Sequence, residues 1–299
     1  MVFSKNASKN FSKTMIYCAF LDPESIAATD DGGGVGSDHV IGVMRNLLES
    51  CFLAETTSWT LRQEFLTAIR ALADPDTRMK LNALVETFEK RDRFVEAIND
   101  IGSDGNVPLA TVVVIQQTNP LLDIIITEQA PTNNGGVEFT AMNRFNRSNF
   151  SQKRQRIFAD GIVLTPGKMS HEKLFEECFG RMLMHCDRFT IEDHLIGQDF
   201  KPNFDFNLNF WDAFFNTANR AISVTVLSSL TCLASKSRLE NRLKTLSHNG
   251  KVTYTLQGNT QPRHERFFRS SAFSLNIGRG IDLCDKNGMN RDICVRFAK

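Results

Sequence analysis

The stretch His264-Glu-Arg-Phe-Phe-Arg-Ser-Ser-Ala-Phe-Ser-Leu-Asn-Ile-Gly-Arg-Gly-Ile-Asp282, near the end of the chain, decides how we expect the C-terminal half to fold. His264 and Arg266 stand two residues apart, so on an extended strand both side chains point to one face. An alternating run follows, and then come Gly278-Arg279-Gly280 and the carboxylate of Asp282. Imidazole, guanidinium and carboxylate groups within so short a stretch predict an anion site, with phosphate as the expected anion.

Around this stretch the sequence alternates between strand and helix patterns. Short β-branched or apolar runs predict strands over Ile162–Leu164, Arg188–Ile196, Ile222–Leu230, Lys251–Leu256 and Ile293–Phe297. Helical spacing of apolar residues predicts helices from Ser170 to Cys186, over Phe206–Arg220 and over Lys236–Ser247. This order predicts a mixed sheet covered by helices.

The N-terminal half also combines strands and helices. Met15–Leu21 is wholly apolar and predicts a buried strand. Helical spacing of apolar residues predicts helices over Val40–Phe52, Leu61–Leu72 and Leu81–Ile98. Two more strands, over Leu109–Gln116 and Leu121–Thr127, have a connection short enough for a hairpin.

The fold class expected from these patterns is α/β with two domains, which suits a chain of 299 residues. Residues 1–142 form an N-terminal α/β domain of unknown role. Residues 143–160 form a basic linker segment, and residues 161–299 form the second domain with its mixed sheet. The 24 phenylalanines, against 2 tyrosines and 2 tryptophans, are expected mainly in the cores, because Phe has no polar group to satisfy.

The overall charge and the cysteines limit which partners and which cellular compartment we expect for the protein. A net charge of +1 predicts no attraction of the whole molecule to nucleic acid or acidic membranes, so such binding needs a local patch. The 7 cysteines are scattered without a C-x-x-C pair, which favours buried free thiols in a reducing compartment. The N-terminus lacks the apolar core of a signal peptide, and no stretch approaches the roughly 20 apolar residues of a membrane span. We expect a cytoplasmic protein.

The segment Asn143–Arg156 differs from the rest in holding basic residues and two phenylalanines but no acid. Basic side chains neutralise phosphates, and aromatic faces stack on bases. The segment is therefore a candidate for nucleic-acid contact, with a solvated linker and a partner-protein surface as the alternatives. Its basic residues are Arg144, Arg147, Lys153, Arg154 and Arg156.

The order of motifs from residue 188 to the C-terminus resembles a known domain. An acidic strand end, Ile191-Glu-Asp-His-Leu-Ile196, precedes the β-branched run Val224–Leu230, then His264-x-Arg266 and finally Leu275–Asp282. This resembles the phospholipase-D-like domain found at the C-terminus of MIT-domain proteins and in bacterial defence and conflict systems. The resemblance implies a bacterial protein associated with antiphage defence, and the N-terminal half resembles no family.

Compared with the catalytic motif of phospholipase-D enzymes, His-x-Lys-x4-Asp, this chain departs at two positions. The nucleophilic His is matched by His264, the phosphate-binding Lys by Arg266, and the orienting Asp by Ser271. The resemblance therefore implies these candidate catalytic residues: His264, Arg266, Glu192, Asp193, His194 and Asp282. The candidate phosphate-binding residues are Gly278, Arg279 and Gly280.

Three interpretations of the second domain stay open. It is a divergent nuclease or phosphodiesterase, a catalytically inactive module that binds phosphate or phospholipid, or a fold whose motif is structural. The first makes nucleic acid the expected partner, and the second makes it an adaptor for a partner protein or acidic lipid headgroups. A protein encoded in the same operon is an expected partner under either. A homodimer would supply the second half-motif that active members of the superfamily need.

No bound metal or cofactor is expected, with Mg²⁺ as the alternative. Asp22, Glu24, Asp30 and Asp31 follow the first strand, and acids at the end of a parallel strand can bind Mg²⁺. The acids are adjacent in a loop, however, and loop acids are usually just solvated.

Overall fold

The structure is a computed structural model in which the chain divides into two compact units. Unit 1 is Ile16–Arg156 and unit 2 is Ile157–Lys299. The structure describes residues 14–27, 36–56, 59–98, 122–129, 137–165, 178–194, 196, 211–212, 214–218, 220–229, 233–246, 250–258, 265–278, 284–285, 288–289 and 293–298.

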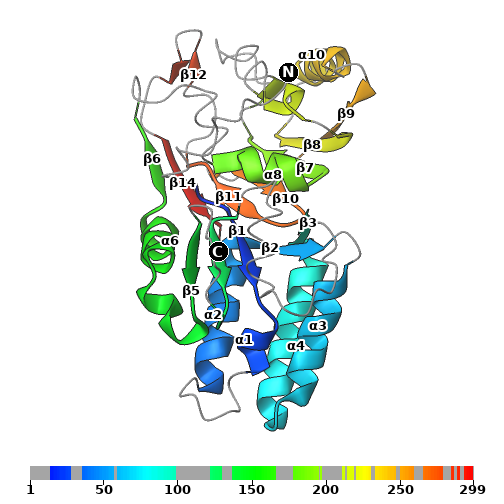
Figure 1. Ribbon diagram of the computed structural model, residues 1–299. Helices are drawn as coiled ribbons and strands as arrows, with labels where there is room; N and C mark the ends of the chain where they lie inside the picture. Colours follow the sequence, from blue (N-terminus) through cyan, green and yellow to red (C-terminus); the bar gives the residue numbers. More distant parts are fainter. Residues whose placement is uncertain are drawn as a thin grey trace. The chain divides into compact units, whose positions relative to one another are not determined.

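Unit 1 is built on a parallel sheet of five strands in the order β3-β2-β1-β4-β5 (Figure 1). The strands are β1 (Tyr17–Leu21), β2 (Cys51–Thr56), β3 (Phe94–Ile98), β4 (Ile124–Ile126) and β5 (Glu138–Thr140). Every residue of β1, β2 and β4 is buried, as expected where helices cover both faces of a parallel sheet. The strand predicted over Met15–Leu21 is confirmed.

The helices of unit 1 follow from local sequence signals. They are α1 (Glu24–Ala27), α2 (Ser37–Ser50), α3 (Thr60–Ala71), α4 (Pro75–Lys90), the 3₁₀ helix η2 (Met142–Arg147) and α6 (Asn149–Asp160). Asp74 caps α4 by accepting hydrogen bonds from the N–H groups of Asp76 and Thr77, and Pro75 starts the first turn. Helix α2 packs on β2 and α4, while α3 packs on β2, α1 and α4.

The ends of two predicted helices are wrong. The helix predicted over Val40–Phe52 includes the first two residues of β2, and the helix predicted over Leu81–Ile98 includes all of β3. Helix α2 ends at Ser50, and Cys51 begins β2. Helix α4 ends at Lys90, where Asp92 takes a left-handed conformation with φ of 49°, and β3 follows. In both places a short apolar strand directly continues the apolar spacing of a helix, so periodicity alone does not separate them.

The predicted hairpin is also wrong for the part of it that the structure describes. Strand β4 lies within the predicted strand Leu121–Thr127, but it pairs in parallel with β1 on one edge and with β5 on the other. Both edges of β4 are therefore taken by parallel neighbours. The other strand of the predicted hairpin is Leu109–Gln116. Those residues lie outside the described part of the chain.

The segment expected as a linker over residues 143–160 is helical. It forms most of η2 and all of α6, and the boundary between the units falls inside α6, after Arg156. Phe145 and Phe150 are buried, with ring centroids 6.1 Å apart. The two phenylalanines therefore belong to the packing of unit 1 and are not exposed for stacking on bases.

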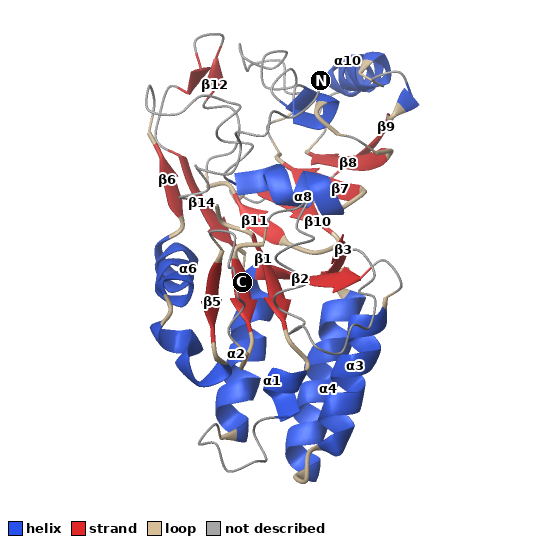
Figure 2. Ribbon diagram, viewed as in Figure 1, coloured by secondary structure: helices blue, strands red, loops and turns tan. Residues whose placement is uncertain are grey.

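Unit 2 contains a seven-stranded mixed sheet in the order β6-β14-β11-β10-β7-β8-β9 (Figure 2). Its strands are β6 (Ile162–Leu164), β7 (Arg188–Glu192), β8 (Ile222–Ser228), β9 (Val252–Gly258), β10 (Phe267–Ser270), β11 (Ser274–Asn276) and β14 (Ile293–Phe297). Pairing is antiparallel from β6 to β7 and parallel from β7 to β9. The predicted mixed sheet is confirmed.

Further helices and a pair of short strands accompany the sheet in the described part of unit 2. Helix α8 (Gly180–His185) and helix α10 (Leu233–Thr245) fall within or near predicted helices, and β12 (Cys284–Asp285) pairs with β13 (Gly288–Met289). Residues between the predicted helix start at Ser170 and residue 177 lie outside the described part. Phe206–Arg220 is described in part, and it is helical at 211–212 and 214–216.

Aromatic packing holds the core of unit 2 together. The ring of Phe268, on β10, stacks on Trp211 at 4.9 Å and on Phe189 at 5.5 Å, and it meets Phe179 edge-on at 4.8 Å. Such pairs contribute about 0.5–1.5 kcal/mol each beyond the area that they bury. The expectation that phenylalanine serves mainly as core is confirmed for these residues.

The prediction that the cysteines are buried thiols is confirmed for four of them. Cys18, Cys51, Cys178 and Cys186 are buried and form no disulfide, and Cys294 is half-buried and forms none either. Burial raises the pKa of the Cys51 thiol to about 12. This thiol is therefore protonated at neutral pH and chemically inert.

Gly161 provides a test of the unit 2 fold. It ends α6 with φ of +75°, and a Cβ there would lie 2.5 Å from the carbonyl oxygen of Val295 on β14. Gly161→Ala should therefore lower the melting temperature and destabilise unit 2 by more than about 2 kcal/mol.

Gly42→Ala is the matched control, because nothing lies within 4 Å of its Cβ in the interior of α2. That change should stabilise by about 0.5–1 kcal/mol. An unchanged melting temperature for Gly161→Ala in calorimetry would contradict this packing.

Candidate functional site

The carboxyl ends of the five parallel strands in unit 1 lie at one edge of the sheet. The strand order reverses between β1 and β4, which is the position where ligands bind in open α/β sheets. Asp22 follows β1 there and Thr127 follows β4. The Thr127 hydroxyl donates to Asp22 Oδ2 at 2.8 Å, and the Asp22 N–H donates to the Ile126 carbonyl at 2.9 Å. The two strand ends are thus joined through Asp22.

Asp22 is an acid in an unfavourable electrostatic position. It is only 3% exposed, and its Oδ1 accepts a hydrogen bond from the Glu24 N–H at 3.1 Å. Burial raises the pKa of the Asp22 carboxyl, and the charges of Glu24 and Glu128 raise it further, although the Thr127 hydrogen bond opposes them. A cation bound to this carboxylate would stabilise its charged form against both effects.

Glu55, at the end of β2, positions the next helix. Its side chain is fully buried and accepts hydrogen bonds from the N–H groups of Leu61 at 2.9 Å and Arg62 at 2.8 Å. A carboxylate there satisfies free N–H groups of the first turn of α3 and complements the helix dipole. Glu55 also accepts from the N–H of Thr56 at 2.8 Å. The start of α3 is therefore fixed to the end of β2.

Helix α3 presents Glu64 close to the same edge. Partial burial raises the pKa of the Glu64 carboxyl, and the charges of Glu55, Asp22 and Glu24 add to this shift. The side chain itself is exposed to solvent. Asp22 and Glu64 are thus near enough to repel each other while one of them stays reachable from outside.

On the other side of Asp22, basic residues follow the end of β5. Glu128, after β4, accepts a hydrogen bond from the Met142 N–H at 2.9 Å, which ties the start of η2 to the strand ends. Arg144 and Arg147 lie on η2 and are exposed. The 3₁₀ helix η2, which follows β5, thus carries two solvent-exposed guanidinium groups.

Any metal ion at this edge would have few protein ligands. Among the described residues, no three His, Cys, Asp or Glu side chains converge closely enough to hold a metal ion. Mg²⁺ commonly keeps several waters and takes only one or two carboxylates, so Asp22 and Glu64 are the candidate ligands that this edge offers. Of the four acids singled out in the sequence, Asp22 and Glu24 lie at this edge. Asp30 and Asp31 lie outside the described residues.

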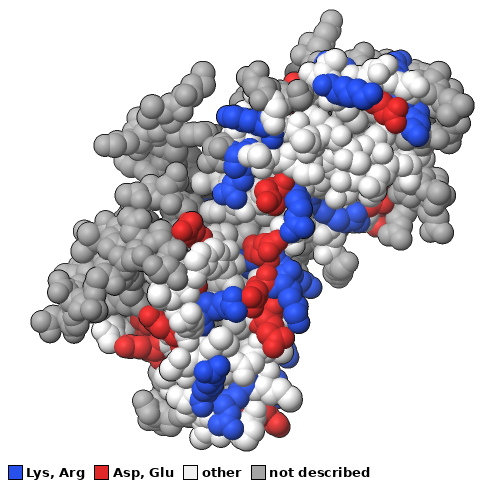
Figure 3. All heavy atoms as spheres, turned by 90° about the vertical axis from the view of Figure 1, so that its right-hand side faces the viewer, with Lys and Arg blue, Asp and Glu red and all other residues white. Residues whose placement is uncertain are grey.

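The basic segment divides into exposed and buried residues. Arg144, Arg147 and Arg156 are exposed, and Lys153 is half-buried. The prediction that Arg154 contacts nucleic acid is wrong, because its side chain is buried and pairs with Glu49 at 3.0 Å and Asn46 at 2.9 Å. It holds α6 against α2. On the face drawn in Figure 3, acidic and basic side chains are intermixed.

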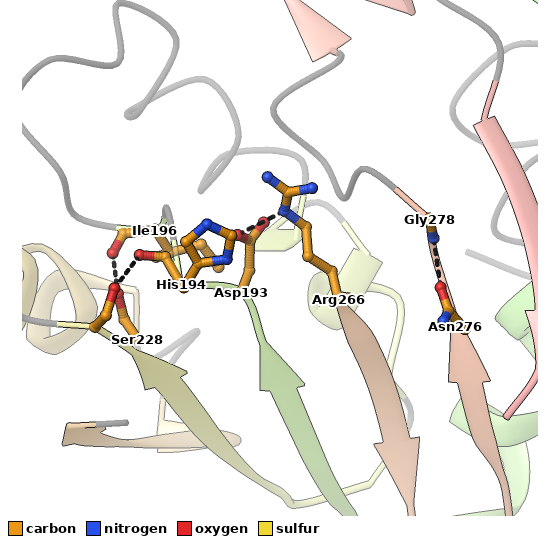
Figure 4. A network of polar contacts seen from close by, with 8 residues as sticks. Asp193, His194, Ile196, Ser228, Arg266, Asn276 and Gly278 are labelled. Carbon is orange, nitrogen blue, oxygen red and sulfur yellow. Dashed lines mark hydrogen bonds and ion pairs between the residues drawn. The ribbon is translucent and has the colours of Figure 1, made fainter. Parts of the chain in front are cut away.

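In unit 2, the ends of β7 and β10 bring together two of the predicted catalytic residues. Asp193 follows β7 and Arg266 precedes β10, and the antiparallel register places Phe267 opposite Glu192. The Arg266 Nε donates to Asp193 Oδ1 at 3.0 Å, and both side chains are buried. Figure 4 shows the two terminal nitrogens of the guanidinium pointing away from Asp193.

A second arginine neutralises the neighbouring acid. Arg269 pairs through Nη1 with the largely buried Glu192, and its Nε donates to Ser274 Oγ at 3.2 Å. Its guanidinium carbon lies 4.2 Å from the centre of the Phe267 ring. Glu192 and Asp193 are thus each occupied by an arginine of the adjacent strand, which supports the structural interpretation of these carboxylates over the catalytic one.

The remaining residues of the predicted unit 2 site are described only in part. His194 lies in the turn after β7, where its carbonyl accepts a hydrogen bond from Ser229 Oγ at 2.8 Å. Gly278 has φ of +60°, and its N–H donates to Asn276 Oδ1 at 2.7 Å, so it serves a tight turn. The other members lie outside the described residues: His264, Arg279, Gly280 and Asp282.

Four residues of the unit 1 edge are not among the site residues predicted from the sequence. Thr127 and Glu128 end a strand that the pattern did predict, so a search of its carboxyl end would have found them. Glu55 carries no such signal, because the apolar run of β2 continues from a predicted helix. Glu64 is an exposed acid of the helix predicted over Leu61–Leu72, where the pattern marks no function. The missed residues are Glu55, Glu64, Thr127 and Glu128.

Comparisons with known proteins place the chain in no family. No model of a known protein family matches it, and no curated protein sequence matches it. The resemblance of unit 2 to the phospholipase-D-like domain therefore stays a prediction. In the described part of the chain, no helix is long and apolar enough to cross a membrane.

The buried pair Arg266–Asp193 should reveal its role through stability. Arg266→Met leaves Asp193 buried without its cation, which should cost about 3–5 kcal/mol in urea unfolding. The double variant Arg266→Met/Asp193→Leu should recover most of this loss, because the pair is then replaced by apolar groups. Arg188→Ala, at an exposed position of β7, is the control and should change stability by less than about 0.5 kcal/mol. If Arg266→Met costs nothing, the pair has no structural role.

Proposed function

We propose that the protein binds and cleaves nucleic-acid phosphodiesters at the carboxyl edge of the unit 1 sheet. The observation that carries the proposal is the position of Asp22, a buried acid at the strand-order reversal whose pKa is raised by burial and neighbouring acids. Such a carboxylate suits a divalent cation, and we take Glu64 on α3 as its co-ligand, because the charge of Asp22 contributes to raising the pKa of the Glu64 carboxyl. When bound there, Mg²⁺ would stabilise charge on a phosphoryl oxygen and activate a water.

The other residues of this edge orient the acids and hold the substrate. Thr127 and the Glu24 N–H fix the two oxygens of the Asp22 carboxylate. Glu55 fixes α3, and with it the position of Glu64. Arg144 and Arg147 on η2 provide exposed guanidinium groups that bind phosphates of the chain next to the cleaved bond.

For unit 2 we propose a non-catalytic role. The pairing of Asp193 with Arg266 and of Glu192 with Arg269 supports an inactive phospholipase-D-like module over a second nuclease site. Such a module would bind a partner protein, such as a product of the same operon, or acidic lipid headgroups. Its resemblance to domains of bacterial conflict systems supports a place in antiphage defence. The buried free thiols support a cytoplasmic location.

Substitution of the two carboxylates tests the proposed chemistry. Purified protein is incubated with plasmid, single-stranded DNA and RNA, with and without Mg²⁺. Cleavage should require Mg²⁺ and should fall at least about 100-fold in Asp22→Asn and in Glu64→Gln, because each removes a charge that holds the ion. Glu86→Gln, an exposed acid of α4, should cleave normally. Equal activity in wild type and both carboxylate variants, or no cleavage of any substrate, would overturn the proposal.

The arginines of η2 should raise the affinity for nucleic acid by neutralising its phosphates. Removal of one cation that neutralises a phosphate reduces the slope of log K against log salt by about 0.7 for single strands. Arg144→Ala/Arg147→Ala should therefore weaken binding and reduce the slope by about 1.4 in fluorescence-anisotropy titrations. Lys90→Ala, an exposed cation at the end of α4, should leave both the affinity and the slope unchanged. A slope that falls equally in the control would mean that the binding is not localised at η2.

A further inference from the structure

Trp59 is a large aromatic side chain exposed at the same edge of the sheet. It is 47% exposed, whereas Trp211, the other tryptophan, is 2% exposed in the core of unit 2. Tryptophan side chains are highly buried on average. A single exposed apolar side chain is common on protein surfaces, so the exposure of Trp59 gains meaning only together with the backbone of this residue.

The backbone at Trp59 does not explain the residue either. Trp59 has φ of 58° and ψ of 37°, a left-handed conformation that is unfavourable for a bulky side chain. It occupies the N-cap position of α3, where Ser, Thr, Asp or Asn is favoured, and its side chain makes no cap hydrogen bond. Burial, backbone conformation and capping thus all favour another residue at this position. Strain of this kind persists where the side chain has a function.

Trp59 is held firmly in place. Its N–H donates to the Thr56 carbonyl at 3.1 Å, and the Thr56 hydroxyl accepts from the Thr60 N–H at 3.0 Å. Glu55 binds the next two N–H groups of the helix, those of Leu61 and Arg62. The turn that presents Trp59 is therefore anchored to the end of β2 on both sides of the residue.

The strand order places Trp59 across the acids from the arginines. Along the edge come the ends of β2, β1, β4 and β5, which carry Trp59, Asp22, Glu128 and the η2 arginines in that order. Three inter-strand spacings separate β2 from β5, roughly 14 Å. A nucleic-acid strand lying along this edge would place phosphates at η2, a phosphodiester at Asp22 and a base at Trp59.

We propose that Trp59 stacks on an unpaired base, and that the substrate of this site is single-stranded nucleic acid. The inference rests on the function proposed above. Aromatic side chains stack on bases of single strands with little sequence preference. In a duplex the faces of the bases are covered by their neighbours, so Trp59 would find no base to stack on without unpairing the strand.

Tryptophan fluorescence tests the stacking directly. Because Trp211 is buried against Phe268, solvent-dependent quenching reports on Trp59. The Glu64→Gln variant is titrated with a 12-nucleotide single strand, as DNA and as RNA, and with the matching duplex. A single strand should quench the emission, and the duplex should bind at least about 10-fold more weakly without quenching. In the Trp59→Asn variant the quenching should vanish, and the affinity for the single strand should fall about 5- to 150-fold.

Replacing Trp59 with asparagine distinguishes a loss of nucleic-acid binding from a loss of folding stability. Asn suits both a left-handed backbone and an N-cap, so Trp59→Asn should melt at the same or a higher temperature while it loses affinity. Trp59→Phe should keep most of the affinity, because a stacking face remains. Met79→Ala removes another exposed apolar side chain, on α4, and should change nothing. Loss of affinity accompanied by a lower melting temperature in Trp59→Asn would count against the inference.

The outcomes distinguish this inference from the proposed function. Stacking without cleavage by wild-type protein would uphold Trp59 and reject the catalytic proposal. Cleavage of duplex and single strand at equal rates, without quenching, would uphold the catalytic proposal and reject the role of Trp59. Quenching by neither nucleic acid, together with unchanged affinity in Trp59→Asn, would leave Trp59 as a contact for a protein partner and overturn the inference.

Discussion

The parallel pairing of β1 with β2 on one edge and with β4 on the other is the constraint on which unit 1 depends. It puts β1 at the centre of the sheet and brings the ends of β1 and β4 together, where Asp22 accepts a hydrogen bond from Thr127. Because all five strands run the same way, acids, arginines and Trp59 reach one edge from segments more than 100 residues apart in sequence. A hairpin in this sheet would have sent one strand end to the opposite side.

The two units use charged residues in opposite ways. In unit 2 the acids that end β7 are each matched by an arginine from β10 or the residue before it, so the charges cancel inside the protein. In unit 1, Asp22 and Glu64 have acids as neighbours, and their pKa values are raised. Paired charges contribute to architecture. The pKa values of Asp22 and Glu64 are raised first by burial and then by neighbouring acids, a combination that is common at functional sites.

The local sequence pattern predicts much of the fold but few of the contacts at the candidate sites. The strand predicted over Ile293–Phe297 is observed with the same bounds, because turn residues isolate its apolar run. Strand β2 was missed because its apolar run continues directly from α2, and with it the role of Glu55 was missed. Arg266 and Asp193 are 73 residues apart, and only the register of β7 with β10 makes them partners. Such pairings depend on tertiary structure, which spacing along the chain does not encode.

Glu55 connects the two proposed contacts of unit 1, the stacking surface of Trp59 and the carboxylate of Glu64. The turn bearing Trp59 and the first turn of α3 both close around its carboxylate, so Trp59 and Glu64 keep a fixed separation along the helix. A shift of β2 along its neighbours would move the stacking surface and the acid together. Under the proposed function, affinity for the cation and choice of strand therefore cannot be altered independently through this region, and a substitution at Glu55 would affect both.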